Sequence, residues 1–284
     1  MEREIKKILI VVNLTKRDAE KIAEDISEYL RSRHIEVDVL RFSESSIELE
    51  QVDYDLAFSL GGDGTVLFSA RLLAVHRIPI MAVNIGDFGF ITEVSKDEWQ
   101  SAFEKYRNGG LGLSERVMLS TSVKRNGSDE VEFVGLNDSV ISAAGISKVV
   151  RLKVTLADTY LGRYRADGVI VSTPTGSTAY SAAAGGPILD PEMNALILNP
   201  ICPFTLSNRP LVLRGDLPVY IEIEYRQRTG VILTIDGQDV FQLQEGDVIC
   251  FKNASPKALI IRSDKRNFFE VLRSKLNWSG GPDA

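Results

Sequence analysis

The sequence predicts two fold classes in succession, a Rossmann-like α/β domain followed by a mostly antiparallel β domain. From residue 1 to about 115, short apolar runs alternate with segments of helical spacing, which is typical of a parallel sheet covered by helices. From 116 to 262 the apolar spacing changes to a period of two, which is typical of half-buried strands. The last segment, 263–284, returns to helical spacing, so we expect a C-terminal helix that docks back on the first domain.

The first domain, 1–115, contains short buried strands and amphipathic helices. Ile22 and Ile26 lie on one apolar stripe of a helix that follows the first strand. Ser95 and Glu98 have capping-box spacing, which predicts the start of a later helix. In chain order we expect a strand at 8–12, a helix at 19–30, strands at 37–40 and 56–60, a helix at 66–75, a strand at 80–83 and a helix at 99–106.

The second domain, 116–262, is expected to consist of strands joined by turns. The run 221–225 alternates between apolar and polar residues, and Asn126-Gly127 and Asp236-Gly237 are typical turn pairs. Phe268, Val271 and Leu272 lie on one stripe of the expected C-terminal helix. The expected strands are 117–124, 131–134, 149–156, 169–172, 219–225, 231–235, 248–251 and 258–261.

Composition excludes several classes of protein. The 284 residues suit about two domains of roughly 150 residues. The net charge of −6 argues against a nucleic-acid partner or a polybasic membrane adaptor. The first apolar run, 8–12, is too short for a signal peptide, and no run is long enough to span a membrane. The only cysteines, Cys202 and Cys250, are expected to be small core residues. We therefore predict a soluble cytoplasmic protein.

The most informative stretch of the first domain is Leu60-Gly-Gly-Asp-Gly-Thr65, between a buried strand and a helix. Glycines at such a crossover let consecutive backbone N–H groups face an anion beside a helix N-terminus, which predicts a phosphate cradle. Asp63 would repel phosphate, so it is expected to orient a hydroxyl or hold a bridging metal. The alternative is a tight turn in which Asp63 caps the helix.

Two stretches of the second domain are candidate ligand contacts. Thr173 to Ser181 carries a dense set of hydroxyl side chains with a Pro and a Gly, which suits a polyhydroxylated or phosphorylated ligand. A solvent loop of hydroxyl-stabilised turns has the same composition. Asn137-Asp138 fits either a ligand clamp or an ordinary turn. His34 and His76 follow helical runs and have no partner pattern, so neither a metal site nor a histidine-based triad is predicted.

Taken together, four motifs resemble the NAD kinase family in order and spacing. They are Gly61-Gly-Asp-Gly-Thr65, Asn137-Asp138, the segment from Asp167 to Ser181 and Asn199-Pro-Ile-Cys-Pro203. The first motif also occurs in lipid kinases of the diacylglycerol and sphingosine type, whereas the segment Thr173 to Ser181 looks specific to NAD kinases. The resemblance covers nearly the whole chain and implies the same two-domain fold.

The resemblance implies transfer of the γ-phosphoryl of ATP to the 2′-hydroxyl of the adenosine ribose of NAD, with Mg²⁺ or a similar cation. It implies that Asp63 accepts the hydroxyl proton and that Gly62, Gly64 and Thr65 hold phosphate. Asn137 and Asp138 would hold the nicotinamide-side ribose or amide, and Asp138 stands where many relatives have Glu. The remaining implied ligand contacts are Lys148, Arg165, Asp167, Thr178, Ala179, Tyr180, Ser181, Ala182, Ala183 and Gln238.

Two residues depart from the family pattern. Phe68 stands where many relatives have a basic or small residue, and Phe204 stands where a His is common. Arg165 favours NAD over NADH if its charge lies near the nicotinamide side. By analogy with the family we expect a homodimer or homotetramer. The competing functions are a lipid kinase and a non-catalytic dinucleotide sensor.

Overall fold

The structure is a computed structural model that describes residues 3–43, 49, 52–86, 89–125, 127–128, 130–145, 148–205 and 208–278. The chain divides into two compact units. Unit 1 comprises Met1–Glu115 and Lys257–Ala284, and unit 2 comprises Arg116–Pro256. Unit 2 ends at Pro256, whereas we predicted that the β domain ends at 262, because the last strand joins the sheet of unit 1.

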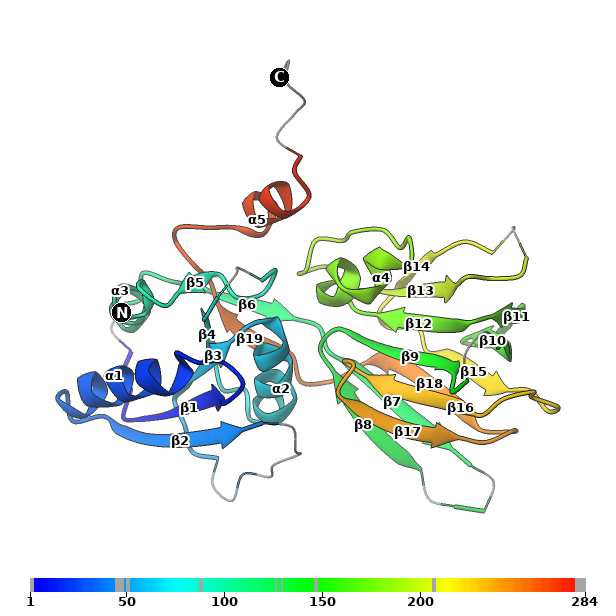
Figure 1. The fold of residues 1–284 in the computed structure, drawn as a ribbon, viewed down its shortest axis with the longest axis horizontal. Helices are drawn as coiled ribbons and strands as arrows, with labels where there is room; N and C mark the ends of the chain where they lie inside the picture. The colour runs from blue at the N-terminus through cyan, green and yellow to red at the C-terminus, as the bar shows by residue number, and fades with distance from the viewer. Residues whose placement is uncertain are drawn as a thin grey trace. The chain divides into compact units, whose positions relative to one another are not determined.

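Unit 1 is built on a seven-stranded sheet in the order β2-β1-β3-β4-β19-β6, with β5 paired to β4 off this path (Figure 1). The pairs among β1, β2, β3, β4, β5 and β19 are parallel. Because parallel strands end at the same edge of a sheet, the residues after β1, β3 and β4 are gathered along one edge. The strands are β1 (Lys7–Asn13), β2 (Glu36–Phe42), β3 (Leu56–Gly61), β4 (Ile80–Asn84), β5 (Val94–Ser95), β6 (Leu113–Arg116) and β19 (Ala258–Ile261).

Helices cover both faces of this sheet. Ile26 and Phe103 are fully buried in one core with Phe58 of β3, so their helices cover the same face. The neighbouring Ser59 points to the other face, where Ser69 donates a hydrogen bond to it at 3.0 Å. The helices of unit 1 are α1 (Ala19–Arg31), α2 (Asp63–Leu73) with the 3₁₀ turn η1 (Ala74–His76), α3 (Trp99–Arg107) and α5 (Phe268–Lys275). The predicted α/β class is confirmed.

The C-terminal segment returns to unit 1, as expected. Strand β19, which we assigned to the β domain, pairs in parallel with β4 through Ile260 and Ile80. Its four residues are all buried, so they show no alternation that would separate a parallel core strand from the antiparallel strands before it. Helix α5 begins with a full capping box between Asn267 and Glu270.

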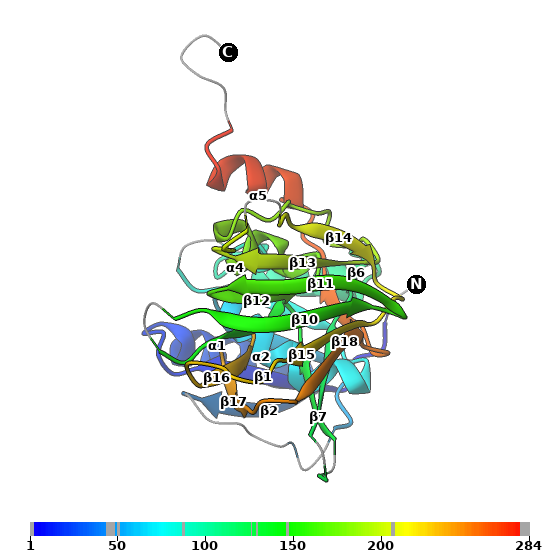
Figure 2. The ribbon, with the colours of Figure 1, turned by 90° about the vertical axis from the view of Figure 1, so that its right-hand side faces the viewer.

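Unit 2 is a sandwich of two antiparallel six-stranded sheets, in the orders β11-β10-β15-β18-β7-β8 and β14-β13-β12-β9-β16-β17. In Figure 2 the green strands β10 and β12 run across the view. Phe251 of the first sheet and Leu198 of the second are fully buried in one shared core. The strands are β7 (Leu119–Lys124), β8 (Val131–Gly135), β9 (Asp138–Ala143), β10 (Val150–Leu156), β11 (Thr159–Ala166), β12 (Gly168–Ser172), β13 (Ala195–Ile201), β14 (Leu211–Arg214), β15 (Val219–Ile223), β16 (Val231–Ile235), β17 (Asp239–Leu243) and β18 (Val248–Asn253).

Several strands of unit 2 were not predicted from the sequence, for identifiable reasons. Strand β13 is buried at six consecutive positions, so its spacing does not alternate. Strand β11 lies at a sheet edge and is mostly exposed, so it lacks an apolar face. The predicted turn at Asn126 lies outside the described residues. Between β12 and β13 the chain forms the 3₁₀ turn η2 (Thr175–Thr178) and the short helix α4 (Tyr180–Ala183).

Candidate functional site

The crossover from β3 to α2 places Asp63 at the carboxyl edge of the unit 1 sheet. Gly62 is the N-cap, with extended backbone, and Asp63 is the first helical residue. Asp63 therefore does not cap the helix, which removes the structural alternative for its carboxylate. A Cβ at Gly62 would meet nothing within 4 Å, so the backbone there is open to a ligand.

The Asp63 carboxylate is held by the segment 89–92, which follows β4. Its Oδ2 accepts a hydrogen bond from the N–H of Phe90 at 2.7 Å. Its Oδ1 accepts from the N–H groups of Ile91 and Thr92 at 3.1 and 3.2 Å, and from the Thr92 hydroxyl at 3.3 Å. Thr92 Oγ1 in turn accepts from the N–H of Gly89 at 3.0 Å. Three consecutive amides therefore fix the side chain in one orientation.

These contacts make the two carboxylate oxygens unequal. A carboxylate offers about two acceptor sites on each oxygen. Oδ1 has three donors, whereas Oδ2 has one among the described residues. Asp63 is half-buried. Oδ2 is therefore the oxygen that can accept a further proton or hydrogen bond from a ligand.

Thr65, which we predicted to contact phosphate, is turned into the protein. It is 1% exposed, and its hydroxyl accepts a hydrogen bond from Asn13 at 3.2 Å. Its N–H donates to the carbonyl of Gly62 at 2.9 Å. Thr65 thus links the end of β1 to the crossover after β3. Phe68 is also buried, and its ring stacks on Phe42 at 4.1 Å between centroids.

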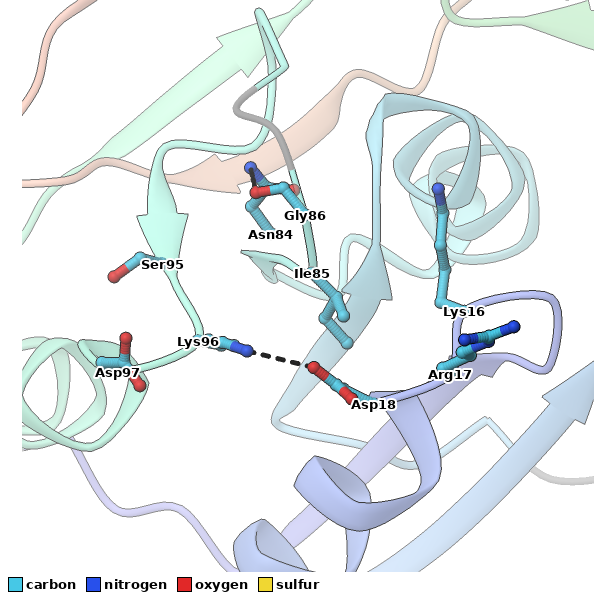
Figure 3. Close-up of a pocket in the computed structure, with 9 residues that line it drawn as sticks. All are labelled: Lys16, Arg17, Asp18, Asn84, Ile85, Gly86, Ser95, Lys96 and Asp97. Carbon is cyan, nitrogen blue, oxygen red and sulfur yellow. Dashed lines mark hydrogen bonds and ion pairs between the residues drawn. The ribbon is translucent and has the colours of Figure 1, made fainter.

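A cavity of about 480 Å³ opens at the same edge of the unit 1 sheet (Figure 3). Asn84 at the end of β4 is 3% exposed, and its Oδ1 lacks a hydrogen-bond partner in the described structure. Neither Lys16 nor Arg17 forms an ion pair with any described residue, whereas Lys96 binds Asp18 at 3.0 Å. The lining residues are Lys16, Arg17, Asp18, Asn84, Ile85, Gly86, Ser95, Lys96 and Asp97.

In unit 2, three strand ends converge on Asn137 and Asp138. Strand β9 begins at Asp138 and runs antiparallel to both β12 and β16. Asp138 therefore pairs with Ser172, the last residue of β12, and Ser139 pairs with Ile235, the last residue of β16. The hydroxyl-rich segment after β12 and the turn after β16 consequently lie beside Asn137-Asp138.

Asp236, in the turn after β16, organises this junction. Its carboxylate accepts hydrogen bonds from the N–H groups of Leu136, Asn137 and Asp138 at 2.8, 2.7 and 3.1 Å. Asp138 is 5% exposed. Its burial, together with the negative charge of Asp236, raises the pKa of Asp138 to about 7.

The hydroxyl-rich segment is an ordered wall rather than a solvent loop. Thr173 donates to the carbonyl of Leu136 at 2.6 Å, and the Ser177 hydroxyl accepts from the N–H of Leu189 at 3.0 Å. Asn199 donates to the carbonyl of Ser181 at 3.0 Å. A Cβ at Gly176 would lie 2.2 Å from the Asn137 carbonyl, so only glycine allows this close approach. Near this segment, three buried acceptors have no partner in the described structure: Asn137 Oδ1, Thr175 Oγ1 and Asn199 Oδ1.

Comparison with known proteins assigns the family. Residues 8–111 match the ATP-NAD kinase N-terminal domain and residues 136–263 match the ATP-NAD kinase C-terminal domain. The NAD kinase of Treponema denticola is 45% identical over 278 residues, which cover 97% of this chain and 98% of that protein. The chain belongs to the NAD kinase family. The NAD kinase of Citrifermentans bemidjiense is 40% identical and covers 96% of this chain and 99% of its own length.

Solved structures agree on the fold of this NAD kinase family member. Yeast NADH kinase complexed with NADH superposes with a TM-score of 0.85 at 23% identity, covering 98% of this chain and 90% of that chain. An NAD kinase from Archaeoglobus fulgidus in complex with ATP superposes with a TM-score of 0.77 at 24% identity, covering 97% and 100%. The family assignment agrees with the resemblance seen in the sequence and does not favour the lipid kinase alternative.

The predicted contacts of unit 2 fall at two opposite ends of β12. At the Asn137-Asp138 end lie the neighbouring segment 178–183, with Ser181 fully buried and Tyr180 48% exposed, and the exposed Gln238. At the other end lie Arg165 and Asp167, just before β12 begins. Strand β12 spans four residue steps, which is roughly 13 Å. The structure does not bring these two groups together within one copy.

The second group of predicted contacts is exposed. The Arg165 guanidinium lies over the ring of Phe204 at 5.0 Å, and Phe204 is 72% exposed. Lys148, which follows β9, and Asp167 are exposed as well. The preference for NAD over NADH inferred from Arg165 stays a prediction.

Three further expectations concern cysteines, metals and membranes. The expectation that both cysteines are core residues is wrong for Cys202, which is exposed just after β13 with a φ of 44°, while Cys250 is only half-buried. Within the described ranges, no group of three His, Cys, Asp or Glu side chains is arranged to hold a metal ion. None of the described helices is both long and apolar enough to cross a membrane.

The sequence reasoning missed three sets of site residues. Asp236 was assigned only to a turn, although its pattern of Asp-Gly after a strand also fits an anchor for neighbouring amides. The segment 89–92 carries no charged side chain, so apart from its glycine nothing in its sequence indicates a role at a functional site. The cations of the cavity, Lys16 and Arg17, follow β1 as Asp63 follows β3. Because both strands end at the same edge of the sheet, their position in the sequence could have indicated that they lie near Asp63.

The raised pKa of Asp138 predicts a pH-dependent stability. Between about pH 4, where an unfolded aspartate titrates, and about pH 7, the folded state retains a proton that the unfolded state releases. Stability attributable to this group therefore falls as the pH rises through that window and is level above it. Urea unfolding of wild type and Asp138→Asn from pH 4 to 8 should show the variant gaining relative stability as pH rises. The exposed Asp158→Asn variant serves as the control, and parallel curves for Asp138→Asn would contradict the assignment.

Proposed function

We propose that this protein catalyses ATP-dependent phosphorylation of NAD at the 2′-hydroxyl of its adenosine ribose, with Asp63 as the proton acceptor. The observation that carries the proposal is the fixed Asp63 carboxylate, whose Oδ2 keeps acceptor capacity at an open glycine crossover. Membership of the NAD kinase family supports the same reaction.

Asp63 would take the hydroxyl proton as the new bond to phosphorus forms. Phosphoryl transfer depends mainly on positioning and charge neutralisation, so a carboxylate already held in one orientation needs little rearrangement when NAD binds. The protonated Asp63 would release its proton to solvent after the products leave. A dinucleotide sensor has no use for such a group, and this separates the two alternatives.

The cation is proposed to be Mg²⁺ bound together with ATP. Mg²⁺ usually keeps several waters and binds through one or two carboxylates plus substrate phosphates. Because the remaining acceptor site of Asp63 Oδ2 is assigned to the 2′-hydroxyl, the ion would be held mainly by the ATP phosphates and water. When bound, the ion would neutralise charge on the transferring phosphoryl group.

We assign the ATP phosphates to the edge of the unit 1 sheet that carries the cavity. Lys16 and Arg17 offer positive charge there, and the unpartnered Oδ1 of Asn84 can accept a hydrogen bond from a ribose hydroxyl. Gly62 and Gly64 would add backbone contacts at the start of α2. We assign NAD to the unit 2 wall, where Asn137 and Asp138 offer side-chain oxygens and the segment 178–183 offers the small side chains of Ala179, Ala182 and Ala183.

Asp63→Asn tests the proton-acceptor role. The amide keeps the size of the side chain but cannot take the proton, so kcat should fall by about 10²–10⁴ while NAD affinity stays within a few-fold. The measurement is NADP formed from NAD, ATP and Mg²⁺, read through an NADP-specific dehydrogenase, with NAD binding followed by calorimetry. Wild-type kcat in the variant would refute the role. A wild-type protein that binds NAD without forming NADP would instead favour the sensor.

Lys16→Ala and Arg17→Ala test the proposed ATP phosphate site. Each removes one charged hydrogen-bond donor, so KM for ATP should rise by roughly tenfold while KM for NAD is unchanged. Lys21→Ala, which removes an exposed cation from the first turn of α1, is the matched control. If KM for ATP responds equally to all three substitutions, the cavity does not bind the donor.

We also propose that the protein acts as a homodimer or homotetramer in the cytoplasm. The separation of Asp138 and Asp167 by the length of β12 supports an oligomer in which the Arg165-Asp167 end of one copy meets a ligand bound by another. The exposed Phe204 and Tyr180 offer apolar surface for such an interface. The lack of a disulfide between the two cysteines agrees with a reducing compartment.

Subunit complementation tests this arrangement. Asp138→Asn and Asp167→Asn are each expected to be inactive as homo-oligomers. When both are co-expressed, about one quarter of the sites should regain both wild-type residues and activity should return. Light scattering with size-exclusion chromatography checks the oligomer. If the mixed oligomer forms but its activity stays at the background level, each copy completes its own site.

A further inference from the structure

The segment 89–92, whose last three residues hold Asp63, is itself held from the C-terminal segment. Glu93 follows Thr92 directly, and its carboxylate accepts a hydrogen bond from the N–H of Ser263 at 3.1 Å. The Glu93 carbonyl accepts from Nη1 of Arg266 at 3.2 Å. Glu93 is 8% exposed, so these contacts are largely shielded from water. The end of the Asp63 clamp is thus tied to residues 263–266.

A second tie lies at Glu98, on the same stretch of chain. Arg266 binds its two carboxylate oxygens in a fork, at 2.7 and 3.1 Å. Glu98 also accepts from the N–H of Ser95 at 3.1 Å. The Arg266 charge and these hydrogen bonds lower the pKa of Glu98 to about 2, so the pair stays ionised at neutral pH.

We propose that Arg266 is a positioning residue for Asp63: it fixes residues 93 and 98, on the stretch that directly follows segment 89–92, and the amides of residues 90–92 fix the carboxylate. The inference rests on the proposed role of Asp63 as proton acceptor. The hydrogen bonds of Arg266 described above go to Glu93 and Glu98, so its action on Asp63 runs through this segment.

The geometry of Arg266 explains why an arginine is needed. Its planar fork donates to one backbone carbonyl and to two carboxylate oxygens simultaneously. A lysine is a compact point charge that can pair with Glu98 but cannot reproduce the two-pronged contact while also reaching the carbonyl. The nearby Lys265 pairs with Glu98 at 3.3 Å, and its side chain is 51% exposed.

Arg266→Met tests the inference, because it keeps the aliphatic stem and removes every donor. Misplacing a reacting group by about 1 Å can lower a rate by about 10²-fold, so we expect kcat to fall by about 10- to 100-fold. KM for NAD and for ATP should change less than threefold. Arg266→Lys should recover only part of kcat. The exposed Arg273→Met on α5 is the control and should behave as wild type.

A double-mutant cycle separates positioning from a general structural role. If Arg266 acts through Asp63, Arg266→Met should lower kcat in the wild type but cause no further loss in Asp63→Asn. An equal loss in both backgrounds, or no loss in either, overturns the inference. Wild-type kcat in Asp63→Asn overturns the proposed role of Asp63 itself, and that single variant identifies this failure without reference to Arg266.

Gly89→Ala provides a second route if Arg266→Met folds poorly. A Cβ at Gly89 would lie 1.8 Å from Asp63 Oδ1, and its φ lies outside the left-handed region, so alanine acts by displacing the carboxylate rather than by backbone strain. Gly112→Ala, where the nearest atom is 4.0 Å away, is the matched control. The inference requires Gly89→Ala to lower kcat by about 10- to 100-fold with unchanged KM values, at a melting temperature near that of Gly112→Ala. Wild-type kcat in Gly89→Ala contradicts the clamp.

Discussion

The hydrogen bonds from three consecutive amides to the Asp63 carboxylate are the constraint on which the rest of unit 1 depends. Those amides belong to the segment after β4, whereas Asp63 follows β3, so the contact exists only because β3 and β4 pair in parallel and end at the same edge. The contact also requires glycine at position 89, where any side chain would occupy the space of the carboxylate. The parallel sheet, the glycine at position 89 and the orientation of the Asp63 carboxylate therefore depend on one another.

In unit 2, too, one carboxylate accepts hydrogen bonds from three consecutive amides, but the consequence is different. The Asp236 carboxylate also accepts from three consecutive amides, those of residues 136–138, but there the held group is the backbone and the carboxylate is the anchor. This anchor lies beside Asp138, and the two negative charges together with burial keep a proton on Asp138 near neutral pH. Hydrogen bonds to Asp236 thus stabilise the backbone of residues 136–138, whereas burial and the nearby charge disfavour the ionised form of the Asp138 side chain. Groups with such perturbed pKa values are typical of ligand-binding sites.

How far the sequence predicted this arrangement depends on the kind of signal. The order of the two fold classes and the position of Asp63 followed from apolar spacing and from glycines flanking one carboxylate. Strand β19 was assigned to the wrong unit because a fully buried parallel strand and an antiparallel core strand share the same composition. The clamp at 89–92 and the role of Arg266 could not be predicted, because both depend on contacts between segments about 30 and about 200 residues from Asp63, and backbone donors leave no mark in a side-chain pattern.

The choice of donors around Asp63 has a physical consequence. An arginine placed directly on this carboxylate would fix it equally well, but would neutralise its charge and occupy both oxygens, leaving a poor acceptor for a hydroxyl proton. Backbone amides fix the orientation as neutral dipoles and leave Oδ2 with acceptor capacity. The cation that rigidifies the clamp is instead paired with Glu98, and Arg266 reaches the clamp through the Glu93 carbonyl. Because the ion pair is separate from Asp63, the carboxylate is held in one orientation while Oδ2 keeps its acceptor capacity.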